Sequence, residues 1–202
     1  MKYLFLLIST FTFAQQTEFV DFKSVLGKIT IDPITKTVSG NVTYDFQVLK
    51  RSELLGIVTE NTKCLAVSGT HGKTTTSSIL AHLLYQCNEK VTAFIGGISE
   101  NYQSNFIQNG TAISVVEADE FDRSFLTLSP DFACITSMEA DHLDIYDSEA
   151  DLVASFKAFT QNIKPKGKLF IKKGLPFDGI TYGVNETADY SALNVNILKG
   201  DY

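Results

Sequence analysis

Eight consecutive residues have the composition of a loop that binds phosphate groups. They are Gly69-Thr70-His71-Gly72-Lys73-Thr74-Thr75-Thr76, between an apolar run and a helical pattern. Two close glycines allow a tight turn that points backbone N–H groups inward, and the next helix adds the positive end of its dipole. Lys73 supplies a charge for the outer phosphates, and Thr74 is placed to hold magnesium. We therefore predict that residues 69–75 bind a nucleotide.

The match to the pattern G-x-x-x-x-G-K-[ST] is incomplete, because Val67 stands where the first glycine is expected. An ordinary glycine-rich turn is the alternative. A strand before the loop and an amphipathic helix after it favour nucleotide binding.

A second candidate site is the acidic run Glu117-Ala118-Asp119-Glu120-Phe121-Asp122, which directly follows the apolar residues 114–116. Four carboxylates this close repel one another unless some are solvated or bind a cation. Glu117 is therefore a candidate metal ligand. An acidic turn that caps the next helix explains the run equally well.

A third candidate is His142, in the run Glu139-Ala140-Asp141-His142-Leu143-Asp144. A histidine flanked by aspartates can bind a metal through one ring nitrogen while a carboxylate orients the other. A structural histidine is the alternative. We expect His142 to share a sheet edge with Thr74 and Glu117, which favours the metal.

These residues need a parallel sheet to bring them together. Apolar runs that predict strands occur at residues 64–67, 91–95, 112–116, 132–136 and 168–171. The intervening segments are long enough for crossover helices. One helix is expected to place Ile79, Leu80, Leu83 and Leu84 on one face, and another to place Leu152, Phe156, Phe159 and Ile163 on one face. The predicted fold class is α/β, a P-loop parallel sheet with flanking helices, whose strand carboxyl ends carry the chemistry.

The first fifty residues have a different character. Residues 1–14 have the charged start, short apolar core and small-residue cleavage site of a secretory signal, although a hydrophobic first strand is the alternative. Neither interpretation gives a membrane span. Residues 15–49 are predicted to be a β-hairpin segment, because residues 28–48 alternate and turn chemistry occurs at Asp32-Pro33 and at Ser39-Gly40-Asn41. This start resembles a secreted zinc aminopeptidase of the gluzincin type, but no H-E-x-x-H motif is present.

Composition limits the partners. The chain has 202 residues and a net charge of -6, without a strong Lys/Arg cluster, which argues against nucleic-acid binding. Its three cysteines have no metal-site spacing. Their odd number and the placement of two of them in apolar runs fit a reducing cytoplasm.

Residues 50–202 resemble the central, ATP-binding domain of the Mur ligases. The resemblance rests on G-T-H-G-K-T-T-T at Gly69, E-A-D-E-F-D-R-S-F at Glu117 and E-A-D-H-L-D-I-Y at Glu139. Related ligases that add tripeptides to UDP-muramate or glutamates to folate share the loop. The run 117–125 favours the alanine-adding members.

The resemblance implies ATP and Mg²⁺ as cofactors, with UDP-N-acetylmuramate and L-alanine as substrates. ATP would phosphorylate the muramate carboxylate, and the amine of alanine would attack the acyl phosphate. It also implies catalytic roles for Lys73, Glu117 and His142: Lys73 would contact the transferring phosphate, Thr74 and Glu117 would hold one magnesium ion, and His142 would contact a second.

Two departures from the family shape our expectations. The segments expected to bind UDP, adenine and the amino acid are missing, so we expect that this polypeptide does not complete ligation. The amino-terminal segment indicates secretion while the ligase portion indicates the cytoplasm, and the simplest hypothesis is a chimera joined between Val48 and Ser52. The alternatives are a secreted, non-enzymatic protein with a vestigial P-loop and a generic P-loop ATPase.

Overall fold

A computed structural model describes residues 18–139 and 146–195, and the side chains from residue 23 onward. The predicted signal segment 1–14 and His142 lie outside these residues. Contacts divide the chain into two compact units, Met1–Leu54 and Leu55–Tyr202. None of the helices in the described residues is both long and apolar enough to cross a membrane.

The first unit contains the predicted hairpin. Strand β1, Glu18–Asp32, pairs antiparallel with β2, Thr37–Lys50. The turn follows Asp32, whose Oδ1 accepts hydrogen bonds from the N–H groups of Ile34 (2.8 Å) and Thr35 (3.2 Å). The turn predicted at residues 39–41 was wrong, because these residues lie inside β2, opposite residues 28–30. The aspartate turn closes the hairpin earlier and leaves Gly40 as a strand residue.

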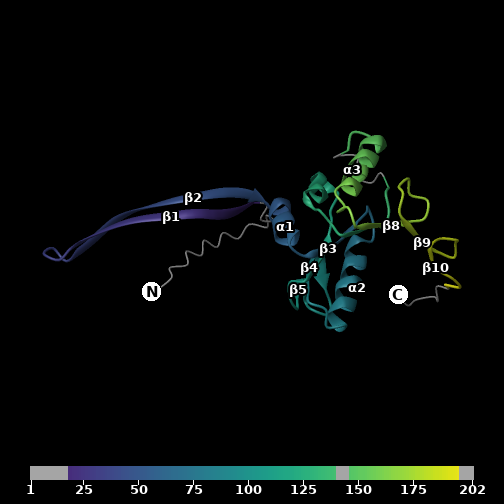
Figure 1. Cartoon of the computed structure of the whole chain (residues 1–202), viewed down its shortest axis with the longest axis horizontal. Helices are drawn as coiled ribbons and strands as arrows, with labels where there is room; N and C mark the ends of the chain where they lie inside the picture. The colour runs from purple at the N-terminus through teal and green to yellow at the C-terminus, as the bar shows by residue number, and fades with distance from the viewer. Residues whose placement is uncertain (1–17, 140–145, 196–202) are drawn as a thin grey trace. The chain divides into compact units, whose positions relative to one another are not determined.

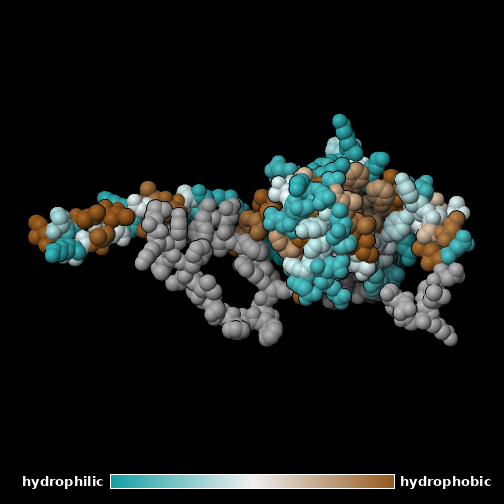
Figure 2. Space-filling view, turned by 90° about the horizontal axis from the view of Figure 1, so that it is seen from below, coloured by the Kyte–Doolittle hydropathy of each residue, from teal (hydrophilic) through white to brown (hydrophobic). Residues whose placement is uncertain are grey.

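The hairpin exposes a row of apolar side chains (Figure 2). Ile31 pairs with Val38 and Val25 with Tyr44 across the two strands, and all four side chains are exposed. Isolated two-stranded hairpins have little stability of their own in water. Within the described residues, the hairpin therefore depends on its backbone ladder and these cross-strand pairs.

The second unit is built around an eight-stranded sheet in the order β10-β9-β8-β7-β3-β6-β4-β5 (Figure 1). All neighbouring strands are parallel except β4 and β5. The elements from α1 onward are α1 Arg51–Glu60, β3 Lys63–Ser68, α2 Lys73–Gln86, β4 Val91–Ser99, β5 Ser104–Gln108, β6 Ile113–Glu117, the 3₁₀ segment η1 Phe121–Thr127, β7 Phe132–Ile135, α3 Glu149–Gln161, β8 Lys168–Lys172, β9 Ile180–Val184 and β10 Tyr190–Ala192.

The five predicted strands are confirmed as β3, β4, β6, β7 and β8, within a residue or two at most ends. Strand β4 runs four residues further than predicted, to Ser99. The structure adds β5, β9 and β10, which the sequence analysis did not predict. These strands lie at the two ends of the sheet and are more exposed, so their sequences lack the continuous apolar runs of buried parallel strands.

The predicted apolar face of α2 packs against the sheet only in part. Small residues, Ser77 and Ala81, are the buried ones, which lets the helix approach the strands closely. Leu80 and Leu84 pack against the core as expected. Ile79 and Leu83, however, are each 56% exposed and line an apolar groove of about 640 Å³ beside β3 and β7. Ile79, Leu80 and Leu83 line the same groove and so share a face of α2, but only part of that face packs against the core.

Helix α3 buries Leu152, Phe156 and Phe159 as predicted, while Ile163 lies beyond the end of the helix and packs against the same core partly buried. Phe125 of η1 stacks on Phe159 at a centroid distance of 4.9 Å and meets Phe156 edge-on at 5.3 Å. Ser148 caps the helix by accepting a hydrogen bond from the N–H of Asp151 at 3.2 Å. The aromatic cluster therefore holds α3 against the segment that follows β6.

Truncating this cluster should destabilise the second unit. We expect Phe156→Ala to lower the free energy of unfolding by about 3–5 kcal/mol, because it removes a fully buried ring and leaves a cavity. Urea unfolding followed by circular dichroism measures the loss. Phe121→Ala is the matched control, since the Phe121 ring is half-exposed, and it should change stability by under about 1 kcal/mol. Equal losses in both variants would contradict the packing described.

Candidate functional site

The predicted loop lies at the carboxyl end of β3, in the middle of the sheet. Strand β3 pairs with β6 on one side and β7 on the other, and β4 lies beyond β6. All four strands are parallel, so the segments that leave them emerge at the same edge. The chain order reverses around β3, and such a switch point is where open α/β sheets bind ligands.

The loop adopts a conformation that needs glycine at two positions. Gly69 has φ 131° and Gly72 has φ 81°, both in the region that other residues rarely adopt. A side chain on Gly69 would also collide with Thr136 Oγ1 and the backbone of Ser137. The start of the loop is therefore packed directly against the chain that leaves β7.

Ser137 organises the first half of the loop. Its Oγ accepts a hydrogen bond from the His71 N–H at 2.7 Å and lies 2.9 Å from Thr70 Oγ1. Thr136 Oγ1 donates to the carbonyl oxygens of Ser68 (3.0 Å) and His71 (2.5 Å). Neither Thr136 nor Ser137 was among the predicted site residues. Their one signal was position, as hydroxyl residues directly after a strand that neighbours the loop.

The start of α2 keeps donors available for an anion. The residue before the helix is Gly72, which has no side chain to cap the first turn. The N–H groups of a first helical turn have no partner within the helix and favour negative charge. Thr75 lies on this turn with an exposed side chain. The His71 ring is also exposed and lies 3.5 Å from Glu139 Oε2.

The structure brings Thr74 and Glu117 together, as predicted. Thr74 Oγ1 donates to Glu117 Oε1 at 2.8 Å, and the Gly96 N–H donates to Glu117 Oε2 at 2.6 Å. A Cβ on Gly96 would lie 2.6 Å from Glu117 Oε1. Gly96, which the sequence analysis missed, therefore leaves the space that this carboxylate occupies.

Lys73 points to the acidic run. Its Nζ donates to Glu120 Oε2 at 2.8 Å and Oε1 at 3.0 Å, and to the Gly69 carbonyl oxygen at 2.8 Å. Asp119 Oδ1 lies 3.7 Å away. Asp119 also accepts a hydrogen bond from the Phe121 N–H at 3.3 Å. Asp119 therefore caps the turn, whereas Glu117 and Glu120 contact residues of the loop and α2, and metal binding by Glu117 stays a prediction.

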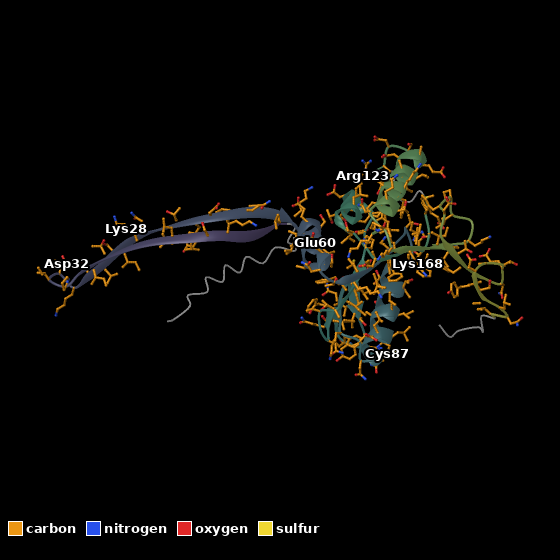
Figure 3. The ribbon with its side chains drawn as sticks, in the orientation of Figure 1. Lys28, Asp32, Glu60, Cys87, Arg123 and Lys168 are labelled. Carbon is orange, nitrogen blue, oxygen red and sulfur yellow. The ribbon has the colours of Figure 1, made fainter. Side chains whose placement is uncertain are left out.

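Hydrogen bonds join the segment after β6 to the rest of the unit. Tyr146 donates from its hydroxyl to the Glu120 carbonyl oxygen at 2.6 Å. Burial, and secondarily the charge of Glu120, raises the pKa of Tyr146 to about 12, so the hydroxyl keeps its proton at neutral pH. Arg123, near α3 in Figure 3, donates to Asp151 Oδ2 at 2.6 Å and stacks over the Tyr146 ring.

The donor set suits one magnesium ion shared with a nucleotide. In the described residues, no three His, Cys, Asp or Glu side chains gather as a metal site of their own. Mg²⁺ usually takes one or two protein oxygens and completes its shell with phosphate and water. Thr74 Oγ1 and Glu117 provide such a pair. The role predicted for His142 remains a prediction, since that residue lies outside the described part of the chain.

The sheet is mostly parallel, a glycine-lysine-threonine loop lies at its switch point, and a carboxylate accepts a hydrogen bond from the loop threonine. These features define the class of P-loop nucleotide-binding proteins. Residues 67–197 match the Mur ligase middle domain. The chain belongs to this family.

Two relatives of this chain are ligases of the same family. The chain is 58% identical over 158 residues to a UDP-N-acetylmuramate--L-alanine ligase of Flavobacterium psychrophilum, and 48% identical over 167 residues to one of Parabacteroides distasonis. Each alignment covers 78% of this chain. The chain spans about a third of the length of these relatives, 35% and 36%.

Solved structures show the same fold. A UDP-N-acetylmuramate-alanine ligase from Thermotoga maritima is 28% identical, with a TM-score of 0.57 over 67% of this chain and 31% of that one. A UDP-N-acetylmuramate:L-alanyl-gamma-D-glutamyl-meso-diaminopimelate ligase from Neisseria meningitides is 26% identical, with a TM-score of 0.57 over 62% of this chain and 44% of that one.

The fit between Gly96 and Glu117 can be tested by adding one methyl group. We expect Gly96→Ala to displace the Glu117 carboxylate and to weaken Mg²⁺-dependent nucleotide binding about tenfold, equivalent to about 1.4 kcal/mol. Titration calorimetry with MgATP, and with ATP in EDTA, separates the magnesium-dependent part. Gly27→Ala is the control, because nothing lies within 4 Å of a Cβ there. Unchanged MgATP affinity in Gly96→Ala would contradict the role of this glycine.

Proposed function

We propose that this chain provides the ATP-binding part of a ligase that joins L-alanine to UDP-N-acetylmuramate. The observation that carries the proposal is the joint placement of Lys73, Thr74 and Glu117 at the switch point of the sheet. The 58% identity to UDP-N-acetylmuramate--L-alanine ligases supports the choice of substrates. The reaction belongs to peptidoglycan synthesis and consumes ATP, so we place the ligase portion in the cytoplasm.

In the proposed reaction, a carboxylate oxygen of the muramate attacks the γ-phosphorus of ATP, and the bond to ADP breaks. The amine of alanine then attacks the acyl carbon of the acyl phosphate. Phosphate leaves, and the nitrogen loses a proton as the amide forms. No side-chain nucleophile is needed, so the protein contributes position and charge.

Each site residue has a defined part in this proposal. Residues 69–75 would surround the phosphates, and the N–H groups of the first turn of α2 would donate to them. Lys73 neutralises charge on the transferring phosphoryl group. Thr74 and Glu117 would hold Mg²⁺, which stabilises negative charge on the phosphates when it is bound. His142 is proposed as a ligand of a second magnesium ion.

The first test is nucleotide binding. We expect Lys73→Ala to lower MgATP affinity at least about tenfold, because hydrogen bonds to charged groups contribute about 1.5–3 kcal/mol. Titration calorimetry measures the affinity. Lys157→Ala, at an exposed position of α3, is the matched control and should bind like the wild type.

The other candidate functions predict different results. A secreted protein with a vestigial loop predicts no MgATP binding in either the wild type or Lys73→Ala. A generic P-loop ATPase predicts ADP formation without UDP-N-acetylmuramate. The ligase predicts that ADP formation, where it occurs, requires UDP-N-acetylmuramate. Binding that is equal in the wild type and in Lys73→Ala would contradict the proposed site.

A further inference from the structure

The ammonium group of Lys73 is held by a carboxylate with no assigned role. Glu120 has no exposed surface, and only 12% of the Lys73 side chain is exposed. The two Glu120 oxygens and the Gly69 carbonyl oxygen, all within 3.0 Å of Nζ, match the three N–H donors of an ammonium group. This pair joins residues 47 positions apart in the sequence.

The backbone around Glu120 is held in place by hydrogen bonds. Its own carbonyl oxygen accepts the Tyr146 hydroxyl, and the neighbouring Arg123 is tied to Asp151 of α3. A lysine side chain carries about 2 kcal/mol of rotamer entropy when it is free. A buried partner that holds Nζ removes much of this freedom before any nucleotide arrives, and pre-organised charge is what stabilises phosphoryl transfer.

We propose that Glu120 is the positioning residue for Lys73. It holds the ammonium group beside Gly69 of the loop. When ATP binds, Lys73 keeps one hydrogen bond to Glu120 and donates another to the outermost phosphate. This inference rests on the proposed function, because it assumes that the loop binds ATP. It adds that a residue outside the loop determines how strongly the protein responds to the γ-phosphate.

Asp119 provides a matched comparison. It is the adjacent acidic residue and also faces Lys73, but its side chain is 53% exposed and its Oδ1 lies 3.7 Å from Nζ. Ion pairs that are exposed to water contribute little. If total negative charge near Lys73 were what mattered, Asp119 and Glu120 would have similar effects. If fixed position matters, only Glu120 has a large effect.

The experiment compares Glu120→Gln and Asp119→Asn in the 202-residue chain. Titration calorimetry gives the dissociation constants for MgATP and MgADP, and thermal unfolding gives stability. We expect Glu120→Gln to weaken MgATP binding about tenfold, with a clearly smaller loss for MgADP, so that the preference for ATP falls. Asp119→Asn should change both constants by less than about twofold.

Other outcomes would overturn the inference. Equal losses for MgATP and MgADP would mean that Glu120 has a structural role only, and tighter MgATP binding would mean that it restrains Lys73. Should Glu120→Gln fail to fold, Glu120→Asp keeps the charge but withdraws it by one methylene, and it must show the same ATP-selective loss. A wild type without MgATP affinity would overturn the proposed function as well, whereas binding that Glu120→Gln leaves unchanged would overturn this inference alone.

Discussion

The parallel pairing of β3 with both β6 and β7 is the constraint on which the site depends. Parallel strands release their carboxyl ends at one edge, so the loop, the acidic run and the chain after β7 must meet there. These segments are closely packed, because Thr136 and Ser137 leave no room for a side chain at position 69. The loop conformation is therefore maintained by the residues that follow β7 as well as by its own glycines.

Within that frame, neighbouring carboxylates acquire different chemistry. Glu117 is partly open to solvent and contacts a threonine hydroxyl and a backbone N–H, which suits a carboxylate that exchanges its partners for a metal ion. Glu120 is buried with a lysine, and Asp119 is exposed. Since removing one partner of a buried pair leaves an uncompensated charge, the Lys73–Glu120 pair constrains the sequence more than the exposed Asp119 does.

The sequence predicted the parts of the fold that have strong local signals. The buried strands β3, β4, β6, β7 and β8 are continuous apolar runs, and the turn preference of glycine marked the loop. It did not predict β5, β9 and β10, whose mixed composition reflects their exposed places at the sheet ends. It did not show that Ile79 and Leu83 are exposed, because helical periodicity groups residues on a face but does not show that the small residues Ser77 and Ala81 are the ones buried against the sheet.

Some residues of the candidate site could likewise be predicted from the sequence, and others could not. Lys73, Thr74 and Glu117 could be found from residue type and spacing, because a phosphate-binding loop and an acidic strand end have recognisable patterns. Gly96, Ser137 and the partner of Lys73 could not, since their importance arises from contacts between segments far apart in the chain. A glycine that makes room and a serine that supports a turn have no chemistry of their own to mark them. Residues that position a site are therefore the ones for which the three-dimensional arrangement is needed.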